Sequence, residues 1–462
     1  MTGPKHSCGV VGIKADFDIA SAMHTALMII QHRGQESAGI TAYDDGSMET
    51  VKGNGLVETA IPKEDLVKLR GKVGVGHVRY SAAGQKDVVN AQPLVATSSF
   101  GSVAVAHNGD ITNSEQLKQK YMKEDGWTFH TKSDSELINK ILSKHLSSVG
   151  DPVKAIRATM SELDGAYALT ILINDRLFGV RDPYAFRPLC IGKIDGGIIV
   201  VSESAAIDAL RGEFVRDLEP GEICEITKDT YKSDIVKPEH PRAMCMFEWV
   251  YFARPDSVID DRGVYEVRKR IGEVLARECP ADADLVMPIP DSGRAHAIGY
   301  AIQMGLPYEE GFMKNRFAGR TFILPEQSQR EFAVSTKMIP IGRTVKDKRI
   351  VIVDDSIVRG TTLKKLVAML RKAGAKEVHV RVGSPPIIAP CYYGVDMTTR
   401  DQFIANHYSV EEIREILGAD SIGYISLDGM VEAFGFKKED LCLACTNAIY
   451  PTRIDGEECR RD

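Results

Sequence analysis

The sequence predicts an α+β first half built in layers, followed by an α/β second half with a parallel sheet. In the first half, short apolar or alternating runs separated by turn signals predict strands, among them CGVVGI, VGVGHVRY, VAVAHNG, YALTILI and IIVVSES. In the second half, strand and helix patterns alternate, from ADLVMPIPDSG through KRIVIVDD and TLKKLVAMLRKAG to EVHVRVG. Such alternation is typical of helices covering a parallel sheet.

Two helices are expected to interrupt the strands of the first half. The first places Ile19, Met23, Ala26, Leu27 and Ile30 on one face, and residues 133–146 form the second. The polar stretch 228–242 separates the two patterns, so we place the domain boundary between residues 240 and 241.

Composition narrows the class of protein. The 462 residues are 44% hydrophobic, which is enough for two large cores. A net charge of -6 offers no general basic surface and therefore disfavours nucleic acid as a partner. An anionic ligand must instead bind at a local site. The sequence lacks a signal peptide or a membrane-spanning run, which predicts a cytoplasmic protein. Nine cysteines, an odd number, favour thiol chemistry over disulfides.

The stretch 349–362 predicts a phosphate site. An apolar strand ends in Asp354 and Asp355, and a Gly-Thr-Thr turn leads into an amphipathic helix. A helix N-terminus attracts anions, and the donors expected there are Ser356, Gly360, Thr361 and Thr362. The two carboxylates are placed to bind ribose hydroxyls and Mg²⁺. A strand end with ordinary capping residues is the alternative interpretation.

This segment, VIVDDSIVRGTT, resembles the phosphoribosyl pyrophosphate loop of type I phosphoribosyltransferases. Together with PIPDSG, SPPIIAPCYYGVD and FEWVYFARPDS, it resembles the amidophosphoribosyltransferases, also called glutamine phosphoribosylpyrophosphate amidotransferases. The resemblance implies one Mg²⁺ per subunit, held by Ser292, Asp354 and Asp355. It also implies a loop over the pyrophosphate that includes Lys314 and Arg316, although a basic loop taken alone is more often a solvated surface.

The N-terminal segments CGVVGI, QHRGQESAGI, GHVRYSAAG and HNGDITN resemble the N-terminal nucleophile glutaminase domain, an αββα fold. The resemblance implies that Cys8 is the nucleophile and that residues 1–7 are a propeptide, because the free α-amino group of Cys8 must serve as the base. Asn108 and the backbone of Gly109 match the oxyanion donors. The implied glutamine-binding residues are Arg79, Asp134, Arg33 and Tyr80. Where the family usually has threonine, this chain has Ala82, which puts a glutamine contact in question.

Cys442 and Cys445 form a C-x-x-C pair, which alone is compatible with zinc, redox chemistry or chance. Cys245 and Cys391 fall where the cluster-bearing branch of the family places two further ligands. The resemblance therefore implies one [4Fe–4S] cluster per subunit with a structural role, and a Cys₄ zinc site is the alternative. On this basis the domains are 8–240 for the glutaminase, 241–425 for the transferase and 426–462 for a C-terminal segment with cluster ligands.

The resemblance implies a reaction in two parts: glutamine is hydrolysed, and its ammonia replaces the pyrophosphate of phosphoribosyl pyrophosphate to give 5-phospho-β-D-ribosylamine. It also implies a homotetramer inhibited by purine nucleotides such as AMP and GMP. Two alternatives remain. A phosphoribosyl pyrophosphate sensor without turnover would not need the glutaminase residues, and a sugar-phosphate or asparagine-forming amidotransferase would not need the phosphoribosyl loop.

Overall fold

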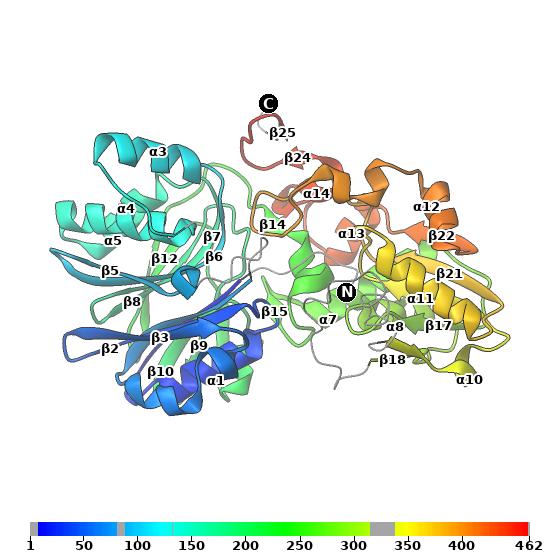
Figure 1. Cartoon of the computed structure of the whole chain (residues 1–462), viewed down its shortest axis with the longest axis horizontal. Helices are drawn as coiled ribbons and strands as arrows, with labels where there is room; N and C mark the ends of the chain where they lie inside the picture. Colours follow the sequence, from blue (N-terminus) through cyan, green and yellow to red (C-terminus); the bar gives the residue numbers. More distant parts are fainter. Residues whose placement is uncertain (1–7, 81–87, 132, 315–337, 461–462) are drawn as a thin grey trace.

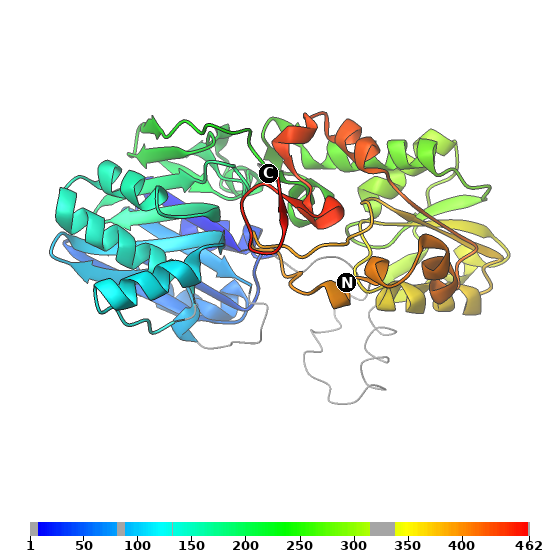
Figure 2. The same cartoon turned by 90° about the horizontal axis from the view of Figure 1, so that it is seen from above.

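A computed structural model describes residues 8–80, 88–131, 133–314 and 338–460. They form two lobes, one from each half of the chain, and the C-terminal segment lies between them (Figure 1, Figure 2). Within these ranges, no helix combines the length and the apolar composition needed to cross a membrane.

Two antiparallel sheets stack at the centre of the first lobe. The first sheet has the order β11 (Glu213–Asp217), β9 (Cys190–Ile194), β10 (Gly197–Val201), β1 (Gly9–Ala15), β4 (Val73–Arg79), β2 (Ser37–Asp44) and β3 (Ser47–Asn54). The second has the order β13 (Tyr231–Ile235), β12 (Glu222–Ile226), β8 (Arg176–Arg181), β7 (Gly165–Ile173), β6 (Gly101–Ile111) and β5 (Leu94–Ser98). A buried apolar core that includes Val10, Val75, Ala106 and Leu172 fills the space between the sheets.

Helices cover the outer face of each sheet. The helix α1 (Ala20–Ile30) buries Met23, Leu27 and Ile30 against the first sheet, as the sequence predicts. The helices α4 (Asp134–Val149) and α5 (Pro152–Met160) pack on the second. α4 runs beyond the predicted end because the chain leaves the helix only at Gly150, whose φ of +66° suits glycine. The predicted αββα layering is confirmed. Shorter helices are α2 (Val57–Ala60), α3 (Ser114–Glu124) and α6 (Ala205–Ala209).

A parallel sheet forms the centre of the second lobe, as predicted. Its order is β17 (Leu285–Pro288), β20 (Arg349–Asp354), β21 (Glu377–Val382) and β22 (Ser421–Tyr424). The helices α7 (Val264–Glu278), α8 (Arg294–Met304) and α13 (Leu427–Phe434) share a core on one face. On the other face lie α11 (Thr361–Lys372) and α12 (Val410–Leu417). The short strands β18 (Phe312–Lys314) and β19 (Met338–Pro340) pair beside α10 (Gly342–Val345).

The C-terminal segment connects the two lobes. Its strand β23 (Leu441–Cys442) pairs in parallel with β14 (Met244–Cys245), at the start of the second half. One apolar core joins Ala166 and Phe186 of the first lobe with Tyr393 of the second and Tyr450 of the segment. The remaining elements are β15 (Val258–Ile259), β16 (Arg262–Gly263), α14 (Ala444–Asn447), β24 (Ile449–Tyr450) and β25 (Glu458–Cys459).

Candidate active sites

Cys8 precedes β1 and lies beside the end of β4. The register of the two strands sets Gly9 opposite Val78, which places Cys8 next to Arg79. The Cys8 thiol donates to the carbonyl of Tyr80 at 3.9 Å. Burial raises the pKa of this thiol, and the hydrogen bond to Tyr80 and the charge of Arg79 only partly oppose the increase. The thiol therefore needs a base before it can act as a nucleophile.

Asn108 and Gly109 lie on β6, in the second sheet. The Asn108 side chain is fully buried, and neither its amide nitrogen nor its oxygen has a hydrogen-bond partner among the described residues. Gly109 has φ +148°, and a Cβ there would lie 1.9 Å from the carbonyl oxygen of Ala166. His77 on β4 donates to the carbonyl of His107 at 3.0 Å, which joins the two sheets directly before Asn108. A buried amide without a partner is a donor available to a ligand.

Asp134 opens α4 beside the end of β6. One of its carboxylate oxygens accepts a hydrogen bond from the backbone N–H of Ile111 at 3.0 Å. This bond ties the Asp134 side chain to the end of β6, the strand that carries Asn108 and Gly109. The other predicted glutamine ligands come from different elements. Tyr80 follows β4, and its hydroxyl donates to Asp396 of the second lobe at 3.4 Å. Ala82 lies outside the described residues.

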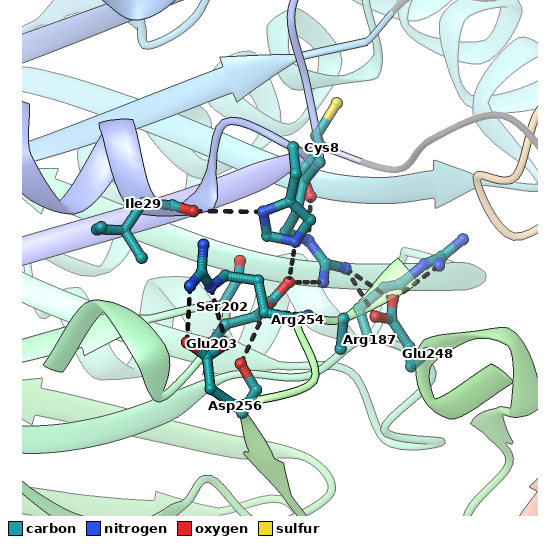
Figure 3. A network of polar contacts seen from close by, with 12 residues as sticks. Cys8, Ile29, Arg187, Ser202, Glu203, Glu248, Arg254 and Asp256 are labelled. Carbon is teal, nitrogen blue, oxygen red and sulfur yellow. Dashed lines mark hydrogen bonds and ion pairs between the residues drawn. The ribbon is translucent and has the colours of Figure 1, made fainter. Parts of the chain in front are cut away.

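Arg33 contacts the backbone of Cys8. Its side chain is fully buried. Its Nε donates to the carbonyl of Cys8 at 3.0 Å, and its other nitrogens donate to Glu203 at 2.6 Å and Glu248 at 2.7 Å (Figure 3). A guanidinium with these partners holds the backbone of Cys8 in place. The contact between Arg33 and glutamine stays a prediction.

The second candidate site lies at the carboxyl ends of β17 and β20, which are neighbours in the parallel sheet. Asp354, Asp355 and Ser356 are fully buried there. Asp355 accepts hydrogen bonds from Ser292 at 2.5 Å and from Ser356 at 2.6 Å. Burial raises the pKa of the Asp355 carboxyl, and these two hydrogen bonds oppose the increase. The sheet thus brings Ser292 to the predicted acidic pair.

The turn predicted to bind phosphate follows the acidic pair. Gly360 has φ +69°, a conformation that suits glycine, and α11 begins at the next residue, Thr361. The N-terminus of this 12-residue helix provides unpaired backbone N–H groups and a favourable dipole. Lys314, at the end of β18, pairs with Asp291, the neighbour of Ser292. Arg316 lies outside the described residues.

Known proteins resemble both halves of the chain. A family model described as a glutamine amidotransferase domain matches residues 77–209, and one described as a phosphoribosyl transferase domain matches residues 262–382. The amidophosphoribosyltransferase of Methanocaldococcus jannaschii is 49% identical, with 98% of this chain and 99% of the relative covered. That of Bacillus subtilis is 42% identical, with 98% of this chain and 96% of the relative covered. The chain belongs to the amidophosphoribosyltransferase family.

A solved structure supports the same assignment. The glutamine phosphoribosylpyrophosphate amidotransferase of B. subtilis, complexed with ADP and GMP, matches with a TM-score of 0.91 and 41% identity over 97% of this chain and 98% of that chain. The protein is therefore an enzyme of the pentosyl-transferring type, and it catalyses glutamine-dependent amidotransfer to phosphoribosyl pyrophosphate in purine biosynthesis.

The four cysteines that the family's cluster-bearing branch would use surround one small apolar cavity between the lobes. Cys245, Cys391, Cys442 and Cys445 line it together with Phe186, Phe247, Tyr393 and Tyr450. Cys245 and Cys442 are also register partners in the β14 and β23 pair. Within the described ranges, no group of three or more His, Cys, Asp or Glu side chains is arranged as a metal site. Four free cysteines that line one cavity are nevertheless a donor type that suits a metal that prefers thiolates.

The sequence analysis missed three buried charged residues beside Cys8, namely Arg187, Glu203 and Glu248. Each is at most 1% exposed. Glu248 begins a π-helical turn, η3 (Glu248–Phe252), within the segment FEWVYFARPDS. No local pattern distinguishes a buried charge from a surface charge, so only the fold could reveal them.

Proposed function

We propose that Cys8, Asn108, Gly109, Arg79 and Asp134 form the glutaminase site of this enzyme. The supporting observation is the Asn108 amide, which is fully buried and lacks a partner among the described residues. In a site of this kind, such a donor would stabilise the oxyanion that forms when a thiolate attacks the glutamine amide. The planar fork of Arg79 suits the α-carboxylate of glutamine, and Asp134 suits its α-ammonium group.

Cys8 must be activated before it can act as a nucleophile. In the full chain the nitrogen of Cys8 belongs to a peptide bond, so it cannot accept a proton. Removal of residues 1–7 would convert it into an α-amine with a reference pKa of about 8, and this amine would take the thiol proton. The thiolate then attacks the amide carbon, ammonia leaves, and water hydrolyses the thioester to glutamate.

In the transferase site, ammonia attacks C1 of phosphoribosyl pyrophosphate, and the C1–O bond to pyrophosphate breaks with inversion. The product is 5-phospho-β-D-ribosylamine. The 5-phosphate would bind Ser356, Gly360, Thr361 and Thr362 at the start of α11. Ser292, Asp354 and Asp355 would hold Mg²⁺, which would supply positive charge to neutralise the pyrophosphate. The supporting observation is that Ser292 and Asp355 lie 2.5 Å apart, oxygen to oxygen, at the ends of neighbouring strands. Lys314 and Arg316 would contact the pyrophosphate.

We also propose that Cys245, Cys391, Cys442 and Cys445 hold one [4Fe–4S] cluster, which would tie the C-terminal segment to both lobes. Their common cavity and their lack of disulfides support this proposal. We further propose a cytoplasmic homotetramer that purine nucleotides such as AMP and GMP inhibit. The supporting observation is that the similar B. subtilis enzyme was solved with ADP and GMP.

Pyrophosphate release with glutamine or with ammonia tests the two sites separately. Cys8→Ala should abolish turnover with glutamine and spare turnover with ammonia, whereas Asp355→Asn should abolish both. Intact mass should show a chain that begins at Cys8. Glutamine-dependent turnover by a chain that retains residues 1–7 would refute the nucleophile assignment. Iron and acid-labile sulfide, measured on protein purified without oxygen, should reach about four of each per chain. Zinc in their place would refute the cluster.

A further inference from the structure

Four buried charged side chains form a continuous network that starts at Cys8 (Figure 3). Arg33 donates to the carbonyl of Cys8 and pairs with both Glu203 and Glu248. Arg187 also pairs with Glu248, at 3.1 Å. Because Glu248 lies in the second lobe and the two arginines lie in the first, the network crosses between the lobes.

The other end of the network reaches the four-cysteine cavity. Arg187 donates from Nε to the carbonyl of Tyr393 at 3.0 Å. The backbone N–H of the same residue, Tyr393, donates to the sulfur of Cys391 at 3.4 Å. Arg187 therefore lies between the nucleophile and the cavity.

Each charge in this network depends on its neighbours. Two guanidinium groups and two carboxylates are withdrawn from water, and a buried charge that loses its partner is strongly destabilised. Glu248 is shared, so its position is set by Arg187 as well as by Arg33. The planar fork of Arg187 reaches Glu248 and the Tyr393 carbonyl at once. A lysine ammonium is a point charge without that fork and cannot reproduce this geometry.

We propose that Arg187 is a positioning residue. Through Glu248 and Arg33, it fixes the backbone of Cys8 for attack on glutamine. This role rests on the proposed glutaminase site, which Cys8→Ala tests separately.

Two variants test this role. Arg187→Lys keeps the charge and loses the fork, and Glu248→Gln weakens the link to Arg33. Arg216→Lys is the matched control, because Arg216 also pairs with a buried glutamate, Glu222 at 2.6 Å. Arg216 lies on β11, which β9 and β10 separate from β1.

This role predicts a selective loss of the glutamine reaction. In Arg187→Lys and Glu248→Gln, kcat with glutamine should fall about 10- to 100-fold, since a small misplacement of a nucleophile has an effect of this size. KM for glutamine and turnover with ammonia should stay unchanged. Alkylation of Cys8 by iodoacetamide, measured by peptide mass spectrometry, should slow. Arg216→Lys should alter none of these quantities. Wild-type kcat with glutamine in Arg187→Lys would overturn the proposal.

Discussion

Replacement of Asn108 by leucine should make the protein more stable and nearly inactive with glutamine. The amide is fully buried and has no partner among the described residues. A buried polar group in that state costs about 1–3 kcal/mol, which an apolar side chain of the same shape would recover. Loss of an oxyanion donor should lower kcat with glutamine about 10²- to 10³-fold. Turnover with ammonia should not change, since the transferase site is separate.

Asn139→Leu provides the matched control. Asn139 is also buried, but its amide donates to the carbonyls of Leu94 at 2.7 Å and Val103 at 3.2 Å. Its replacement should lower the free energy of unfolding by about 1–3 kcal/mol and spare the glutamine reaction. Urea unfolding and the two pyrophosphate-release assays measure these effects. Two results would contradict the assignment of Asn108 as an oxyanion donor without a partner among the described residues. One is a loss of stability in Asn108→Leu as large as that expected for Asn139→Leu, and the other is a wild-type kcat with glutamine.

Two further predictions concern other parts of the structure. Gly394 of the second lobe has φ +96°, and a Cβ there would lie 2.9 Å from the carbonyl carbon of Gly109. Gly394→Ala should therefore reduce kcat with glutamine at least about 10-fold and spare the ammonia reaction. Gly456→Ala, whose φ of +82° is similar but whose Cβ would meet nothing within 4 Å, should leave both unchanged. Burial lowers the pKa of His296 from 6.5 to about 3. The unfolded chain therefore binds a proton that the folded chain excludes, and stability is lost as pH falls from 6.5 towards 3, by about 1.4 kcal/mol per pH unit. The difference in free energy of unfolding between pH 7 and pH 5 should be about 2 kcal/mol smaller in His296→Asn than in the wild type, and an equal difference would contradict this linkage.

The sequence predicted the features that local patterns encode. The alternation of strand and helix patterns predicted the parallel sheet. The helical spacing from Ile19 to Ile30 predicted the buried face of α1. These predictions succeeded because each depends on a short segment and on a general rule of sheet geometry. The grouping of Ser292 with Asp355 came from the family resemblance instead, and the structure brings the two side chains together at the carboxyl ends of neighbouring parallel strands.

The network around Cys8 could not be predicted in this way. Arg33, Arg187, Glu203 and Glu248 are far apart in the chain, and a charged residue in isolation is most often exposed. Their burial depends on two lobes closing around them. The sequence around Arg33 contains glutaminase motifs, but it does not contain the two carboxylates that pair with Arg33 in the structure.

One segment after β21 connects the two candidate sites. At its start, the backbone N–H of Gly383 donates to the carbonyl of Asp354, in the transferase site, at 2.9 Å. Further along, Gly394 packs so closely on Gly109, in the glutaminase site, that no side chain fits between them. Asp396 then accepts the hydroxyl of Tyr80, next to Arg79. Because backbone contacts anchor this segment at both sites, it sets the spacing between the glutaminase site and the transferase site. The interface between the lobes is thus part of the catalytic arrangement, since it fixes where ammonia is released relative to where it is used.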